Sequence, residues 1–250
     1  MSLAPGELRI VPLTGVPEVR EDDDLAELLA AAAARAGGLE DGDVVVVAQK
    51  AVSKAEGRVV RLDALEPSAL ALAIAEDADP RQVEAVLRES ARIVRMRGSL
   101  VIAETRHGFV CASAGVDASN APAPGWLVLL PLDPDASAKR LRGRLAELTG
   151  RRVGVVVSDS FGRAWRQGTT DVAIGAAGLP VLLDLRGRRD RLGYELHATA
   201  IAIADEIAGA AELVLGKTNA VPAALVRGLR LEGEGAARDL VMPPERDLFR

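Results

Sequence analysis

The sequence predicts a mixed α/β protein, and three features indicate that class. Apolar runs bounded by turn residues lie at 43–48 and 153–157 and indicate buried strands. Segments between and after these runs carry apolar residues at helical spacing. No fixed-period repeat or low-complexity linker is visible in the 250 residues. We therefore expect residues 1–250 to form a single folding unit, with a division into two lobes left open.

The predicted elements follow in chain order. Asp22–Asp24 provide acidic caps for an amphipathic helix that begins at Leu25 and stops near Gly37–Gly38. The strand at 43–48 comes next. The later elements are helices at 68–76 and 80–93, a hairpin at 99–113, an apolar run at 126–130, a helix at 137–148, the strand at 153–157, an apolar run at 179–185, a long helix from about Leu196 to Ala210, a run at 213–215 and a short helix begun by Pro222.

Composition excludes several classes of function. The formal net charge is −5, so binding of nucleic acid through bulk charge is not expected, and six aromatic residues leave little material for stacking bases. A lone cysteine, Cys111, cannot form an internal disulfide. Met1–Gly15 lack the pattern of a secretion signal, and no apolar stretch approaches about 18 residues. We expect a cytoplasmic protein that binds neither nucleic acid nor membrane.

Several familiar site signatures fail. Gly216-Lys217-Thr218 resembles the end of a Walker A loop, but Ala211 stands where the first glycine is required, and no G-x-G-x-x-G follows a strand. Ser158-Asp159-Ser160 lacks the glycines of a nucleophile elbow. His107 and Cys111 are too few for zinc, and we expect a packed cysteine beside a surface histidine.

Acidic and hydroxyl side chains follow two predicted strands. Ser158, Asp159 and Ser160 come directly after 153–157, and Asp117 with Asn120 follows the second strand of the hairpin. Either aspartate alone is as readily explained by a turn cap. Together they favour a hard divalent cation, because magnesium sites commonly use one or two carboxylates plus substrate phosphates.

Basic residues suggest an anionic substrate. The segment 49–58 follows a buried strand and contains two of the four lysines, which suggests anion contact, with a solvated loop as the alternative. A set of arginines would suit a substrate with several negative charges, or else form a solvated surface; they are Arg163, Arg166, Arg188, Arg189 and Arg191. These patterns indicate a phosphate-handling α/β enzyme that uses a hard metal, and they leave the reaction open.

Longer sequence segments indicate one particular type of reaction. The ordered segments are 42–58, 114–120, 132–138, 155–163, 187–190, 204–208 and 226–229. Together they strongly resemble the coenzyme F420-0:L-glutamate ligase family over nearly the whole chain. The resemblance implies a mixed α/β fold unlike P-loop or Rossmann enzymes. It also implies a GTP-dependent ligase that adds L-glutamate to coenzyme F420-0, and further γ-linked glutamates, through an acyl phosphate.

The resemblance also implies roles for particular residues. Asp117, and Asp159 with Ser160, match metal ligands; Asn120 matches a GTP contact. The expected catalytic residues are Lys54, Asp117 and Asp159. Further nucleotide contacts are expected at Val16, Pro17, Glu18, Val19, Gln49, Lys50, Lys54, Gly216, Lys217, Thr218 and Asn219.

Two positions depart from the family pattern. Lys217 stands where the family has an acidic metal ligand, in a loop one residue shorter, and Ser113 replaces an asparagine. An ammonium cannot bind a metal ion but can neutralise a phosphate, so we assign Lys217 to the nucleotide.

The implied cofactors are two Mg²⁺ or Mn²⁺ ions per site and K⁺, with GTP as co-substrate, in a homodimer. Three alternatives remain open: a ligase for another carboxylate acceptor, a GTP-binding module without activity, and one part of a longer bifunctional protein.

Overall fold

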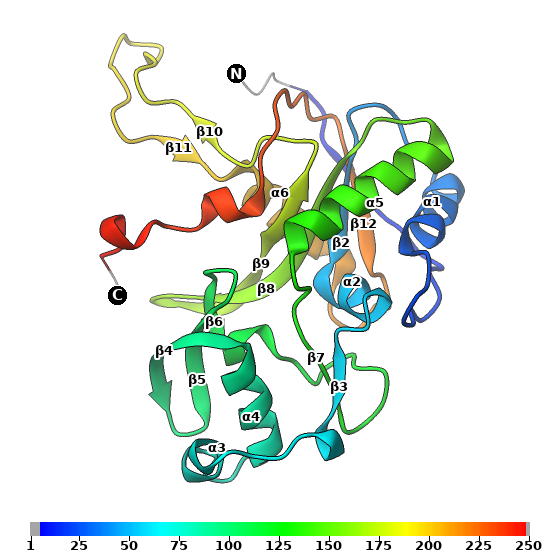
Figure 1. Ribbon diagram of the computed structural model, residues 1–250. Coiled ribbons are helices and arrows are strands. Elements are labelled where there is room, and N and C mark those ends of the chain that lie inside the picture. Colours follow the sequence, from blue (N-terminus) through cyan, green and yellow to red (C-terminus); the bar gives the residue numbers. More distant parts are fainter. Residues whose placement is uncertain (1–5, 249–250) are drawn as a thin grey trace.

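The computed structural model describes residues 6–248 and shows a mixed α/β protein, which confirms the predicted class (Figure 1). Residues 1–5, part of the Met1–Gly15 stretch considered above as a secretion signal, lie outside the described part. The central sheet consists of β1 (Arg9–Pro12), β12 (Ala223–Arg227), β2 (Val44–Ala48), β8 (Gly154–Arg163) and β9 (Arg166–Ala177), side by side in that order. β2 and β8 pair in parallel, and the other neighbouring strands pair antiparallel.

Helices cover both faces of this sheet, which explains the uninterrupted apolar runs. Val45 and Val47 pack with α1 (Leu25–Arg35) and α5 (Pro134–Thr149), whereas Val44 and Val46 pack with α6 (Ile203–Leu215) on the opposite face. Figure 1 shows α5 and α1 in front of the sheet and α6 behind it. Because side chains alternate along a strand, a strand covered on both faces needs apolar residues at every position.

Residues 59–130 form a second group of elements with a core of its own. β3 (Val59–Arg61) pairs with β7 (Trp126–Val128), and β4 (Ser90–Arg97), β5 (Leu100–Thr105) and β6 (Val110–Ala112) form a three-stranded sheet. The helices of this group are α3 (Ala69–Ile74) and α4 (Pro80–Glu89). The hairpin predicted at 99–113 is thus confirmed as β5 and β6. The expectation of a single folding unit stays a prediction.

The remaining elements are short. α2 (Gln49–Ala55) follows β2 directly, and β10 (Leu183–Asp184) pairs with β11 (Ala200–Ile201) at the base of a projecting arm (Figure 1). Single 3-10 turns lie at Leu62–Ala64, Ser113–Gly115, Ala237–Leu240 and Pro244–Arg246. None of the helices within residues 6–248 has both the length and the apolar character that a membrane span requires.

Three predicted helix boundaries are wrong. The helix predicted to reach residue 93 ends at Glu89, and the chain continues from Ser90 as β4 because it pairs with β5. The long helix begins at Ile203, since 200–201 form β11, and it absorbs the run at 213–215. Pro222 begins no helix. It precedes β12, and its carbonyl accepts a hydrogen bond from the backbone N–H of Ala48 (2.8 Å), a role that needs no donor from proline.

Cys111 is buried, as expected, and burial raises the pKa of its thiol to about 12. His107, expected at the surface, is partly buried instead. Its Nε2 lies 2.9 Å from the carbonyl of Pro131, and its ring stacks on Phe109. The carbonyl holds the imidazole against the fold, which the local sequence could not indicate.

β9 was not predicted, and it forms an edge of the sheet. Its outward N–H groups are capped by carboxylates: Asp171 N donates to Glu212 Oε2, Ala173 N to Asp205 Oδ1, and Ala176 N to Asp135 Oδ1, each at 2.9 Å. These contacts satisfy donors that would otherwise invite another strand. The first of them also brings Glu212 beside the pocket described next.

Candidate active site

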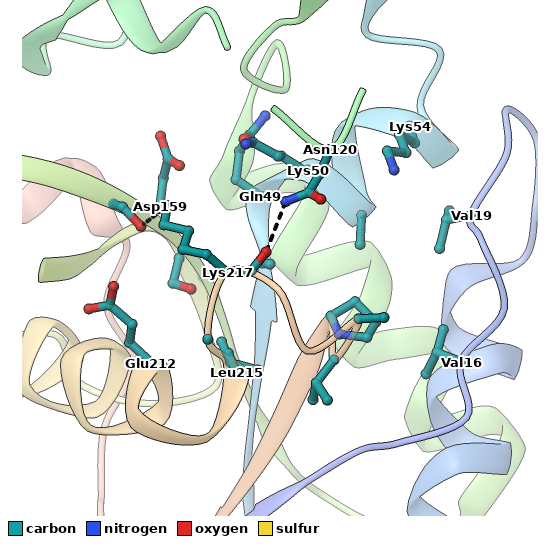
Figure 2. Close-up of a pocket in the computed structure, with 18 of the residues that line it drawn as sticks. Val16, Val19, Gln49, Lys50, Lys54, Asn120, Asp159, Glu212, Leu215 and Lys217 are labelled. Carbon is teal, nitrogen blue, oxygen red and sulfur yellow. Dashed lines mark hydrogen bonds between the residues drawn. The ribbon is translucent and has the colours of Figure 1, made fainter. Parts of the chain in front are cut away.

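A pocket of about 290 Å³ lies where β2 ends, beside the middle of β8 (Figure 2). β2 and β8 pair in parallel as far as Ala48 and Ser158, and the region beyond the carboxyl end of such a strand is the usual place for a ligand in an α/β protein. Six further parts of the chain close the pocket: the 16–19 stretch, α2, Asn120, β9, the end of α6, and the 216–222 segment that follows α6. Segments far apart in the sequence therefore meet at one site.

Most of the predicted site residues line this pocket. They are Val16, Pro17, Glu18, Val19, Gln49, Lys50, Lys54, Asn120, Asp159, Ser160, Gly216, Lys217 and Thr218. Asp117 lies outside the lining and reaches the site through Lys50. Asn219 also lies outside, close to Gly216. The five predicted substrate arginines are exposed on the β8–β9 hairpin and on the projecting arm, outside the pocket lining.

The Lys50 ammonium holds the 117–120 turn against α2. It donates to Asp117 Oδ2 (2.6 Å), to Ser119 Oγ (2.6 Å) and to the Ser119 carbonyl (2.8 Å), so its three N–H groups are all used. Burial favours the neutral form of Asp117, but the hydrogen bonds from Lys50 and Ser119 outweigh it and lower the pKa of that carboxyl. Asp117 is therefore an ionised carboxylate at neutral pH.

Lys54 provides a second fixed cation. Its side chain is buried and forms an ion pair with the exposed Glu18 from the 16–19 stretch. On the preceding turn of α2, Gln49 donates its amide to Ser53 Oγ (2.6 Å) and to the Leu129 carbonyl (3.0 Å). The segment 49–55 is therefore a packed helix and not a solvated loop.

Asp159 lies on β8 among charged neighbours. Burial raises its pKa to about 7; the nearby Asp171 carboxylate adds to the rise, while the Ser160 backbone N–H, Lys50 and Lys217 oppose it. A carboxyl that titrates near neutral pH in a pocket is typical of a functional site. Because burial is the largest cause of the rise, a cation bound beside Asp159 would favour its ionised form.

Lys217 crosses the pocket from the other side. Its Nζ donates to Ser160 Oγ (2.7 Å), and its carbonyl accepts from Asn120 Nδ2 (3.3 Å) (Figure 2). The lysine therefore joins the loop after α6 to β8 and to the 117–120 turn.

Several lining residues were missed by sequence reasoning. They are Ala48, Ala51, Ser158, Asp171, Glu212, Leu215, Ala220, Val221 and Pro222. Ser158 was seen in its motif but not assigned a role. Asp171 and Glu212 carried no local signal, because β9 was unpredicted and Glu212 lies between the helix predicted to end at about Ala210 and the run at 213–215. They reach the pocket only because β9 pairs with β8 and because the Asp171 N–H donates to Glu212 on α6.

The donor chemistry fits a hard cation in part. Carboxylate and hydroxyl oxygens of Asp159, Ser158 and Ser160 suit Mg²⁺ or Mn²⁺. Within residues 6–248, however, no three His, Cys, Asp or Glu side chains converge as a metal site. A cation here would depend on substrate oxygens for much of its coordination.

Fold and site together define a mixed α/β protein with a lysine- and carboxylate-lined pocket suited to an anionic substrate. A model of the F420-0:Gamma-glutamyl ligase family matches residues 15–228. The chain is 50% identical to the Coenzyme F420:L-glutamate ligase of Methanopyrus kandleri, over 97% of this chain and 98% of that protein. It is 44% identical to the protein of the same name from Methanothermobacter thermautotrophicus, over 97% and 99%. The chain therefore belongs to the F420-0:gamma-glutamyl ligase family and is a ligase.

Proposed function

We propose that this protein joins L-glutamate to coenzyme F420-0 at the expense of GTP and adds further γ-linked glutamates. Relatives named for this ligase support the acceptor and the amino acid. The observation that carries the nucleotide is the gathering of lysines: three of the four in the chain, Lys50, Lys54 and Lys217, line one pocket. Three ammonium groups in one pocket can contact the oxygens of a triphosphate, with divalent cations on the pocket carboxylates offsetting the rest of its charge.

The chemistry requires activation of a carboxylate, because its oxygen is a poor leaving group. Transfer of the γ-phosphoryl group from GTP to the precursor carboxylate forms an acyl phosphate and GDP. The α-amine of glutamate then attacks the acyl carbon, the C–O bond to phosphate breaks, and the amine loses a proton. The products are the amide, GDP and phosphate.

We assign the residues as follows. Lys54 and Lys217, with Lys50, neutralise the triphosphate and fix its position. Asp117, Asp159 and Ser160 would hold two Mg²⁺ or Mn²⁺ ions, which supply charge stabilisation for phosphoryl transfer when bound. Asn120 lies beside Lys217 and is placed to contact the nucleotide. K⁺ and a homodimer complete the proposal, and light scattering of the purified protein measures the latter.

The test measures GDP release with GTP, Mg²⁺ or Mn²⁺, F420-0 and L-glutamate, with mass analysis of the product. We expect a mass gain of one or more glutamate residues that requires every component. ATP in place of GTP and the Asp159→Asn variant serve as controls. If GDP is released with a different carboxylate substrate instead of F420-0, that substrate is the acceptor. Nucleotide binding without any product would identify a GTP-binding module without activity.

A further inference from the structure

Asp171 is a buried carboxylate that the predicted chemistry does not use. It is 6% exposed and lies on β9 directly opposite Ser160 in the register of β8 and β9. Ser160 Oγ donates to Asp171 Oδ1 (2.5 Å), and Ser158 Oγ donates to Asp171 Oδ2 (2.9 Å). One carboxylate therefore takes the protons of two pocket hydroxyls.

This arrangement fixes the polarity of both serines. A hydroxyl has one proton, so a serine that donates to Asp171 presents only lone pairs to other partners. An ammonium has donors only, and Lys217 Nζ donates to Ser160 Oγ (2.7 Å). The Lys217 contact therefore requires Ser160 to direct its proton away, toward Asp171.

The backbone of Asp171 is held as well. Its N–H donates to Glu212 Oε2 (2.9 Å) on α6, the helix that leads directly into the loop of Lys217. Strand β9, helix α6 and the Lys217 loop are thus tied together around one carboxylate.

We propose that Asp171 is a positioning residue: it orients the Ser158 and Ser160 hydroxyls as acceptors and so seats the Lys217 ammonium on Ser160, facing the anion that the pocket binds. The inference rests on the proposed function only for the identity of that anion. Asp171 itself acts through the serines.

The first test measures how strongly the Lys217 ammonium is held on Ser160 in the absence of nucleotide. Competitive labelling of amines with isotopic acetic anhydride, read by mass spectrometry, gives the reactivity of Lys217 relative to the exposed Lys139 in the same molecule. Asp171→Ala removes the acceptor of both hydroxyls, so we expect the relative reactivity of Lys217 to rise about threefold, the size of one lost hydrogen bond. An unchanged ratio in this variant would overturn the proposal.

Three controls separate positioning from general damage. Asp205→Asn alters a carboxylate that caps the neighbouring Ala173 N–H of β9 but bonds to neither serine, so the ratio should stay as in the wild type. Ser160→Thr keeps the hydroxyl and should also keep the ratio, whereas Ser160→Ala should raise it. An equal rise in Asp205→Asn would show loosening of β9 instead and would overturn the assignment. Circular dichroism checks that each variant is folded.

The second test uses inorganic triphosphate with Mg²⁺ as the probe, by titration calorimetry. Asp171→Ala and Lys217→Met should each weaken binding about tenfold. In the Lys217→Met background, Asp171→Ala should weaken it less than about twofold further, because both act through one contact. Fully additive losses would contradict the proposal. Failure of the wild-type protein to bind triphosphate, with the labelling result intact, would overturn the proposed nucleotide and not the role of Asp171.

Discussion

At the scale of single residues, lysines occupy oxygens that the predicted chemistry assigns to metal ions. Lys50 contacts Asp117 Oδ2 and Lys217 contacts Ser160 Oγ, whereas Asp159 is bonded to neither lysine. Electrostatic attraction at close range favours such contacts between an ammonium and an oxygen. Among the three predicted metal ligands, Asp159 is therefore the one whose oxygens neither lysine occupies.

Asp159→Asn should lower turnover by at least about two orders of magnitude, because a neutral amide stabilises a bound cation poorly. It should also make the chelator-treated protein more stable at pH 8, by on the order of 2 kcal/mol. The pKa of Asp159 is raised to about 7, so the folded state resists ionisation, and the stability gap should grow from pH 4 to 7 and then level off. Steady-state rates and urea unfolding measure both. Wild-type turnover in the variant would contradict the assigned role.

Glu84 gives a stability prediction away from the pocket. Its side chain, 10% exposed, accepts hydrogen bonds from Ser68 and from Arg88 Nε (2.7 Å), and these contacts lower the pKa of Glu84 to about 2. Because the pKa of Glu84 is lower in the folded state, its ionised carboxylate stabilises the fold above pH 4.5, the unfolded pKa. This stabilisation is lost as the pH falls toward 2. Glu84→Gln should therefore cost about 1–3 kcal/mol at pH 7 and progressively less between pH 4.5 and 2. Urea unfolding across that range measures it, and a gap independent of pH would refute this account.

At the scale of elements, packing of β9 against α5 depends on one missing side chain. A Cβ on Gly175 would lie 2.2 Å from the Pro134 carbonyl oxygen, a backbone atom that cannot move aside cheaply. Gly175→Ala should therefore destabilise the protein by about 1–3 kcal/mol. The matched control is Gly143→Ala within α5, where a Cβ meets nothing within 4 Å. That change should stabilise the helix by about 0.5–1 kcal/mol. Thermal unfolding distinguishes the signs, and equal effects would disprove the packing argument.

At the scale of the whole molecule, residues 59–130 are tied to the central sheet at the pocket. Gln49 donates to the Leu129 carbonyl, and Arg58 donates to the Leu130 carbonyl (2.8 Å) and to Glu89 (2.7 Å). These links, with two connecting chains, predict a single cooperative transition in scanning calorimetry. Two separate transitions would instead identify two lobes that unfold independently.

The sequence alone determined the fold class, the two strands β2 and β8, most helices and most of the pocket lining. Apolar runs and caps are local signals, and the motif strings at 49–54, 158–160 and 216–218 are continuous in the chain. Local signals failed where pairing decides the structure: Pro222 was expected to begin a helix, yet the residues after it form β12 between β1 and β2.

Only the tertiary structure decided which side chains share a proton or a charge. Asp171 reaches Ser158 and Ser160 because β9 folds back along β8, and Lys217 reaches Ser160 across 57 positions of sequence. A hydrogen bond depends on distances of a few ångströms, whereas sequence patterns report the periodicity of nearby residues. The sequence determined most of the residues that line the pocket, whereas the pairing of β9 with β8 added Asp171 and decided how the side chains act on one another.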